Sequence, residues 1–188
     1  NFILMYHDIS LVECVDKFTV SLSNMCSQLL FLKDKYNLVE ISLINKKSKS
    51  FAVTFDDGFE SIYNLVFPFI KKNNIKITLF LTLNNLNKHK YLKTYQITEM
   101  LKSGLVTIGC HGKTHISLKS LNYDFLLKEI IEPKKYLENL FNINIPYISF
   151  PNGKYDLNTL KFCENNFKRT FSSHMRTINL DKYKDNFI

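Results

Sequence analysis

Two adjacent carboxylates at the end of an apolar segment are the first residues that could do chemistry. The segment at 51–55 consists of residues that favour the interior of a sheet, and Asp56, Asp57 and a glycine follow it directly. An Asp-Gly pair is also typical of a turn, and Asp often precedes a helix, so the pair alone has a purely structural interpretation. Two neighbouring carboxylates repel each other, however, and a bound cation would relieve that repulsion.

Two histidines supply further ligands for such a cation. His111 and His115 follow the apolar segment at 105–109. Their spacing suits either one side of a helical turn or the convergence of a strand-end histidine with a loop histidine. Neutral imidazoles bind Zn²⁺ and similar divalent ions, and two of them with one carboxylate form the open three-ligand set of a hydrolytic metal centre. Such histidine pairs are common on surfaces, so the aspartate pair is what strengthens the metal interpretation.

The elements that must position these residues alternate along the chain. Apolar segments that end in polar residues predict strands, and segments with helical periodicity lie between them. Strands that alternate with helices predict right-handed crossovers and a parallel sheet. The predicted strands lie within 2–7, 51–57, 75–83, 105–112, 145–153 and 167–174, and the predicted helices within 60–72, 97–104, 122–142 and 156–166.

Local signals predict where the helices begin, end or bend. Pro68 is expected to kink or shorten the first helix, and Pro133 to interrupt the third. Thr98 is the expected N-cap of the second helix, which Gly104 ends, and Asp156 is the expected N-cap of the last.

Polar residues at the ends of the predicted strands favour a (β/α) barrel. In such barrels the carboxyl ends of the strands form the rim that carries the chemistry. No G-x-G-x-x-G motif follows a predicted strand, which gives a dinucleotide-binding sheet no support. The residues expected to meet on the rim are His7, Asp56, Asp57, His111, Asn152 and His174.

Length and composition indicate one α/β domain spanning residues 1–188. The net charge of +8 comes mainly from scattered lysines, with Arg169 and Arg176 the only arginines. Nucleic-acid sites rely on arginine forks with interleaved aromatics, so no nucleic-acid partner is expected, although weak attraction to an anionic membrane surface stays open.

The cysteines and the first residue of the chain give information on the cellular compartment. The four cysteines show no C-x-x-C spacing, which indicates reduced, mostly buried thiols in a reducing compartment. The chain begins at Asn1 rather than Met, so a trimmed signal or anchor stays open. We therefore expect a cytoplasmic or membrane-associated location.

Three motifs, taken together, resemble the polysaccharide deacetylase family, the NodB-homology deacetylases. They are "TFDDG" at 54–58, "HGKTHISL" at 111–118 and "SFPNGKYD" at 149–156, in that order, and "ILMYHDI" at 3–9 resembles the first strand of one subgroup. The resemblance implies a distorted (β/α)7-type barrel. It also implies a metal-dependent hydrolase that removes N- or O-acetyl groups from sugars, and N-acetyl is the group that we expect here.

The resemblance also implies roles for individual residues. Asp56 is the expected catalytic base, and Asp57, His111 and His115 are the expected ligands of a divalent metal, Zn²⁺ first and Co²⁺, Ni²⁺ or Fe²⁺ as alternatives. The backbone N–H of Asn152 is expected to stabilise the developing oxyanion. The expected substrate is an acetylated amino sugar, an oligosaccharide, or a lipid- or nucleotide-linked sugar.

The C-terminal part of the site departs from the family pattern. His174 is the candidate general acid. Ser149 stands where many members have an arginine that pairs with the catalytic aspartate. Arg176 could supply that guanidinium, or it is a surface arginine.

Two other functions stay open. One is a metal hydrolase of the same fold that opens a cyclic amide or ureide. The other is a glycan-binding protein without turnover, which Ser149 suggests. The sequence leaves the oligomeric state undetermined.

Overall fold

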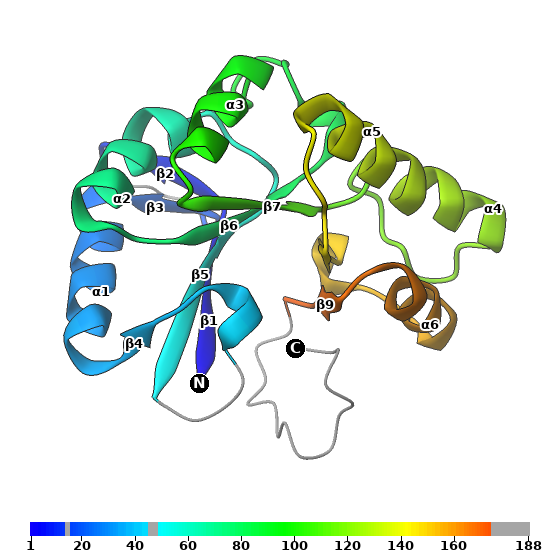
Figure 1. Cartoon of the computed structure of the whole chain (residues 1–188), viewed down its shortest axis with the longest axis horizontal. Coiled ribbons are helices and arrows are strands. Elements are labelled where there is room, and N and C mark those ends of the chain that lie inside the picture. The colour runs from blue at the N-terminus through cyan, green and yellow to red at the C-terminus, as the bar shows by residue number, and fades with distance from the viewer. Residues whose placement is uncertain (14–15, 45–48, 174–188) are drawn as a thin grey trace. The chain divides into compact units, whose positions relative to one another are not determined.

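A computed structural model describes residues 1–13, 16–44 and 49–173. It contains a seven-stranded sheet of order β1-β5-β6-β7-β8-β9, in which β4 also pairs with β5 (Figure 1). The pairs β1–β5, β4–β5, β5–β6, β7–β8 and β8–β9 are parallel. The strands are β1 (Phe2–Tyr6), β4 (Asn37–Leu38), β5 (Ser50–Phe55), β6 (Ile77–Leu81), β7 (Val106–Cys110), β8 (Tyr147–Ser149) and β9 (Arg169–Phe171).

Each of the six apolar segments contains one strand of this sheet, so the predicted parallel α/β arrangement is confirmed. Strand β4 was not predicted, and neither was a second, two-stranded parallel sheet formed by β2 (Asp8–Ser10) and β3 (Thr19–Ser21). These strands have only two or three residues, which is too short for a pattern of alternation to show.

Internal contacts divide the chain into two compact units. The first comprises Asn1–Leu79 and Asn85–Thr107, and the second comprises Phe80–Asn84 and Ile108–Ile188. The expectation of a single domain over 1–188 stays a prediction.

The first unit is built around β5, whose six residues are all buried. Its helices are α1 (Leu22–Lys35), a 3-10 turn (Ile41–Leu43), a π-helical segment (Ile62–Val66), α2 (Phe67–Asn73) and α3 (Thr94–Lys102). Helix α1 was not predicted. Pro68 lies in the first turn of α2, directly after the π-helical segment, so the structure shows a change from π to α geometry where a kink or a shorter helix was predicted.

The predicted start of the second helix was wrong. Helix α3 begins at Thr94, and the Gln96 side chain accepts a hydrogen bond from the Lys93 backbone N–H (2.7 Å) at this end of the helix. Thr98 lies inside the helix, where its hydroxyl donates to the Thr94 carbonyl (2.9 Å). Gly104 ends the segment as predicted, with a left-handed φ of 70°.

The second unit contains the remaining helices. They are α4 (Tyr123–Leu126), a π-helical segment (Leu127–Ile131), α5 (Glu132–Phe141) and α6 (Leu157–Asn166), with a short 3-10 turn at Pro151–Gly153. A further 3-10 turn, Leu83–Asn85, includes residues of both units. The predicted interruption at Pro133 is therefore a change from π to α geometry, since Pro133 lies in the first turn of α5. The described helices are all too short or too polar to span a lipid bilayer.

Two cysteines pack in the core, as predicted. Cys110 and Cys163 are buried free thiols, and burial raises the pKa of the Cys110 thiol to about 12. Cys14 lies outside the described residues.

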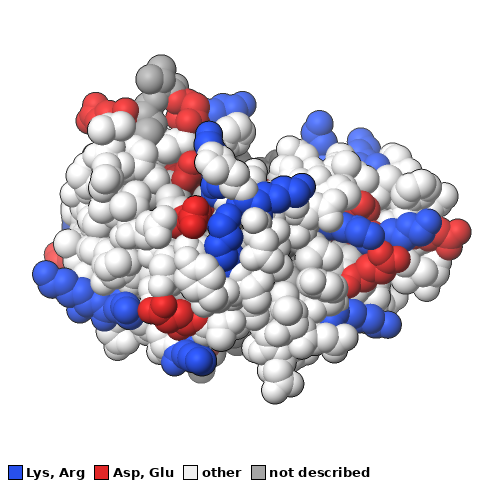
Figure 2. All heavy atoms as spheres, turned by 90° about the horizontal axis from the view of Figure 1, so that it is seen from above, with Lys and Arg blue, Asp and Glu red and all other residues white. Residues whose placement is uncertain are grey.

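Charged side chains of both signs are interspersed over the face seen in Figure 2, with uncharged surface between them. Arg169 lies on β9 and is half-buried. Arg176 lies outside the described residues, and the expectation that nucleic acid is not a partner stays a prediction.

The Asp156 carboxylate, the predicted N-cap of α6, joins this helix to the loop between β7 and α4. It accepts hydrogen bonds from the backbone N–H groups of Thr159 (2.9 Å) and Ser120 (2.7 Å). These bonds, led by that from Thr159, lower the pKa of Asp156. A carboxyl pKa that is lower in the folded state stabilises the fold above the unfolded pKa, and the effect is lost as the pH falls through the folded pKa.

We therefore expect Asp156→Ala to lower the free energy of unfolding by about 1 kcal/mol at pH 7. The deficit should shrink as the pH falls below about 4, where the carboxyl begins to protonate. Urea unfolding at pH 7 and pH 3 measures it, with the exposed Asp124→Ala on α4 as the control. An equal deficit at both pH values would contradict the role of the charged cap.

Candidate metal centre

The aspartate pair lies on a tight turn directly after β5. The Asp56 backbone N–H donates to the Tyr6 carbonyl of β1, and the Gly58 N–H donates to the Asp56 carbonyl, each at 2.9 Å. Asp57 has φ 69° and Gly58 has φ 80°, a left-handed turn that aspartate and glycine adopt more readily than most residues. Asp56 is only 3% exposed, and the Oδ1 atoms of both aspartates are buried.

The loop at 84–96 holds this turn in place. The Leu92 N–H donates to the Gly58 carbonyl (2.9 Å), and the Phe59 ring stacks on Tyr91 with centroids 5.0 Å apart. Partial burial is the main cause of a raised pKa at Tyr91. The negative charges of Asp57 and Asp8 raise this pKa further. Tyr91 therefore lies close enough to Asp57 to interact with its charge, and nothing in the sequence pattern indicated this residue.

His111 follows β7 directly and is 1% exposed. Its backbone N–H donates to the Leu81 carbonyl (2.9 Å), and its Nδ1 lies 2.9 Å from the Ser149 carbonyl oxygen. Because a carbonyl oxygen can only accept, this bond requires a proton on Nδ1. The Nε2 lone pair of a neutral ring is then available to a metal, an arrangement typical of metal-binding histidines.

This contact gives Ser149 a use that the sequence did not reveal. Ser149 is buried, and it orients His111 through its backbone carbonyl, which any residue at this position would offer. The absence of the family's usual arginine here therefore leaves the histidine in place.

A loop, rather than a helical turn, brings His115 back to His111. Gly112 and His115 both have left-handed φ values, 79° and 66°, and the two imidazole centroids lie 5.0 Å apart. Of the two geometries compatible with the four-residue spacing, the structure shows the convergence of a strand-end histidine with a loop histidine.

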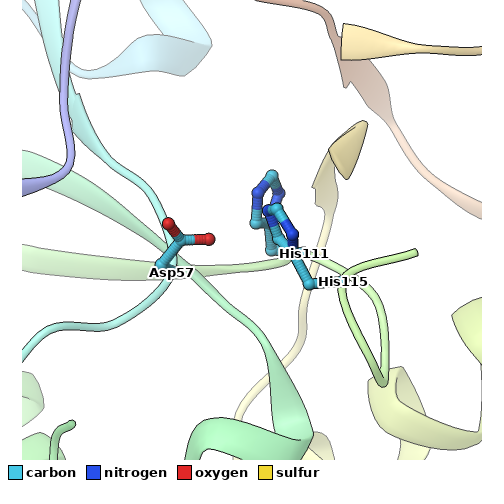
Figure 3. Close-up of side chains that lie close together, drawn as sticks. All are labelled: Asp57, His111 and His115. Atoms are coloured by element: carbon cyan, nitrogen blue, oxygen red, sulfur yellow. The ribbon is translucent and has the colours of Figure 1, made fainter. Parts of the chain in front are cut away.

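The predicted ligands lie close together. One ligand atom from each of Asp57, His111 and His115 lies within 4.8 Å of the other two, and the Asp57 carboxylate points toward the two rings (Figure 3). One carboxylate oxygen with two imidazole nitrogens is a donor set that binds Zn²⁺ and related divalent ions and leaves a position open. The residues therefore fit a catalytic metal.

Asn152 lies on the 3-10 turn after β8, with φ 58° and an exposed side chain. Gly153 follows at φ 65°, and a Cβ at this position would lie 2.4 Å from the Ser173 hydroxyl oxygen, so glycine is required. The role of the Asn152 N–H in oxyanion stabilisation stays a prediction. The candidate general acid His174 and the candidate guanidinium of Arg176 lie outside the described residues, and their roles stay predictions too.

Comparison with known proteins identifies the family. The family model described as polysaccharide deacetylase matches residues 44–166. The chain belongs to the polysaccharide deacetylase family.

Individual relatives agree with this assignment. YxkH of Bacillus subtilis, which is named as a polysaccharide deacetylase, is 32% identical over 116 residues, covering 62% of this chain and 41% of the relative. The poly-β-1,6-N-acetyl-D-glucosamine N-deacetylase of Staphylococcus aureus is 26% identical over 160 residues, covering 74% of this chain and 55% of the relative. The chain thus spans only about half the length of these curated relatives.

The structural comparison confirms the predicted fold class. The Streptococcus pyogenes deacetylase PplD, solved in complex with acetate, superimposes with a TM-score of 0.82 at 26% identity, over 92% of this chain and 83% of PplD. The chain therefore has the NodB-type (β/α) fold that its motifs implied.

Proposed function

We propose that this polysaccharide deacetylase hydrolyses the N-acetyl groups of amino sugars in a glycan, with a divalent metal bound by Asp57, His111 and His115. The convergence of these three side chains in a member of this family is the observation that carries the proposal. The S. aureus relative, by its name, removes N-acetyl groups from a polymer of N-acetylglucosamine. The family assignment and the named substrate of that relative support a glycan substrate here.

The three ligands leave Asp56 for proton transfer. A divalent metal, when bound, polarises an acetyl carbonyl and lowers the pKa of a water molecule. Asp56 is the neighbouring carboxylate, and as general base it accepts a proton from the attacking water. A C–O bond forms and the C–N bond breaks, and the amine nitrogen takes up a proton, so the products are acetate and a free amine.

Two further groups complete the proposed chemistry. The backbone N–H of Asn152 donates to the carbonyl oxygen as negative charge develops there, a contact of a kind that typically accelerates acyl transfer by about 100- to 1000-fold. His174 donates the proton to the leaving amine. We propose Zn²⁺ as the metal, because two imidazoles and one carboxylate form a common catalytic zinc set, and reconstitution with Co²⁺, Ni²⁺ or Fe²⁺ tests the alternatives.

The test is release of acetate by metal-loaded and chelated protein. The panel contains N-acetylglucosamine oligomers, O-acetylated sugars and a cyclic ureide. We expect acetate from the N-acetylated oligomers, a fall of at least about 100-fold on chelation, and recovery when Zn²⁺ is restored. Ring opening of the ureide without acetate release would instead support the cyclic-amide hydrolase. Metal and glycan binding without turnover would support a glycan-binding protein.

A further inference from the structure

Glu129 is a buried carboxylate that contacts the loop carrying His115. Its side chain is 6% exposed, and Oε2 accepts two hydrogen bonds from Thr114, one from the backbone N–H (3.0 Å) and one from the hydroxyl (2.9 Å). Thr114 directly precedes His115 in the sequence. Burial of a carboxylate is costly unless hydrogen bonds compensate for the lost water, and here both bonds come from this one loop residue.

The loop needs such a contact because of its backbone. Gly112 and His115 both have left-handed φ values, and such a conformation is costly for a histidine unless the surroundings hold it. The two bonds from Thr114 act on the residue next to His115. They anchor the residue directly before His115, and thereby restrict the position of the His115 backbone.

The helical segment that carries Glu129 has π geometry and packs against the same loop. Glu129 lies in the π-helical segment Leu127–Ile131, and single π turns are frequent at functional sites. A Cβ on Gly112 would lie 3.6 Å from the Glu129 carbonyl oxygen and 4.0 Å from Oε2, so the loop packs directly on this segment. One turn later, Glu132 forms an ion pair with Lys113 (2.8 Å), but both side chains of that pair are partly exposed.

We infer that Glu129 is a positioning residue that fixes His115 for metal binding through Thr114. The inference rests on the proposed metal site, because it assigns His115 as a ligand. Glu129 itself lies in the shell around the ligands and touches neither substrate nor metal. Residues in this position typically change metal affinity by about 10- to 100-fold when they are replaced.

The test compares Zn²⁺ affinity, measured by chelator competition, for folded variants of the full chain. We expect Glu129→Leu to bind Zn²⁺ about 10- to 100-fold more weakly, and Glu129→Gln to retain most of the affinity because its amide oxygen still accepts from Thr114. Thr114→Val removes only the hydroxyl bond and should give an intermediate loss. The absorption spectrum of the Co²⁺-loaded protein should shift in Glu129→Leu, since the ligand geometry changes.

Two variants on the same helix serve as controls. Glu132→Gln weakens the exposed ion pair with Lys113 and should leave Zn²⁺ affinity unchanged. Glu138 also accepts a backbone N–H, from Ile145 at 2.8 Å, at a position away from the histidine loop. Glu138→Leu should therefore lower thermal stability without changing Zn²⁺ affinity.

The outcomes separate this inference from the proposed function. Wild-type Zn²⁺ affinity in folded Glu129→Leu would overturn the positioning role and leave the metal site standing. Equal losses in Glu129→Leu and Glu138→Leu would overturn it as well, because a general loss of stability would explain both. If Glu129→Leu does not fold, Thr114→Val decides, and unchanged affinity there overturns the inference. A wild-type chain that binds no Zn²⁺ would overturn the proposed metal site itself.

Discussion

Asparagine in place of Asp56 should lower acetate release by about 100- to 10,000-fold, the usual contribution of a general base, while the bound metal is retained. The amide has the shape of the carboxyl group but cannot accept the proton. The backbone of residue 56 is held by its hydrogen bond to the Tyr6 carbonyl (2.9 Å), so the turn should keep its conformation. Acetate release and metal content, measured on the same samples, test both halves of the expectation.

Asp8→Asn is the matched control for Asp56→Asn. Asp8 contributes to the same local negative charge, since it raises the pKa of Tyr91 together with Asp57. Its Oδ1 accepts from the Ile9 N–H (2.8 Å) and the Ser61 hydroxyl (2.5 Å), and an asparagine oxygen can accept both bonds. We expect nearly unchanged turnover in this variant. Loss of metal from Asp56→Asn but not from Asp57→Asn would reverse the two assignments.

Asparagine in place of His115 should weaken Zn²⁺ binding by about 100-fold or more, beyond the roughly 10- to 100-fold effect of residues that only surround the ligands. The choice of asparagine matters because residue 115 has φ 66°, a conformation that asparagine tolerates and alanine does not. The variant therefore removes the imidazole without adding backbone strain. Chelator competition measures the affinity, and acetate release should fall in parallel.

His89→Asn is the control for His115→Asn. His89 is an exposed histidine in the loop at 84–96, so its replacement removes one imidazole from the chain without touching the proposed ligands. Zn²⁺ affinity should stay at the wild-type value. Retained tight Zn²⁺ binding in His115→Asn would remove His115 from the ligand set.

The fold class and the candidate ligands could be predicted from the sequence, and the reason is physical. Strands buried on both faces are continuously apolar, so polar residues directly after them stand out, as Asp56 and His111 do. Parallel strands all point the same way, and therefore their carboxyl ends meet at one edge. The parallel α/β arrangement and the residue types that could bind a metal could be inferred from these local signals, whereas the separate roles of Asp56 and Asp57 came from the family resemblance, and the strand order came only from the structure.

The contacts that orient those ligands depended on tertiary structure. The spacing of His111 and His115 suits a helix or a loop, and only the folded backbone shows the left-handed residues that form a loop. The start of α3 was misplaced for a similar reason, since Thr98 is a good cap by type but the Gln96 side chain occupies the helix end.

The sequence by itself determined the residue types of the site and the strand ends that carry them, because these follow from local polarity and periodicity. The tertiary structure alone decided that the Ser149 carbonyl orients His111 and that Glu129 holds the loop of His115. Every residue has a backbone carbonyl, so the sequence does not indicate which one accepts a hydrogen bond from a histidine. A buried glutamate in an amphipathic helix cannot be distinguished from a solvent-exposed one until its neighbours are known. Both contacts join segments far apart in the chain, 38 residues in one case and 15 in the other, so only folding brings them together.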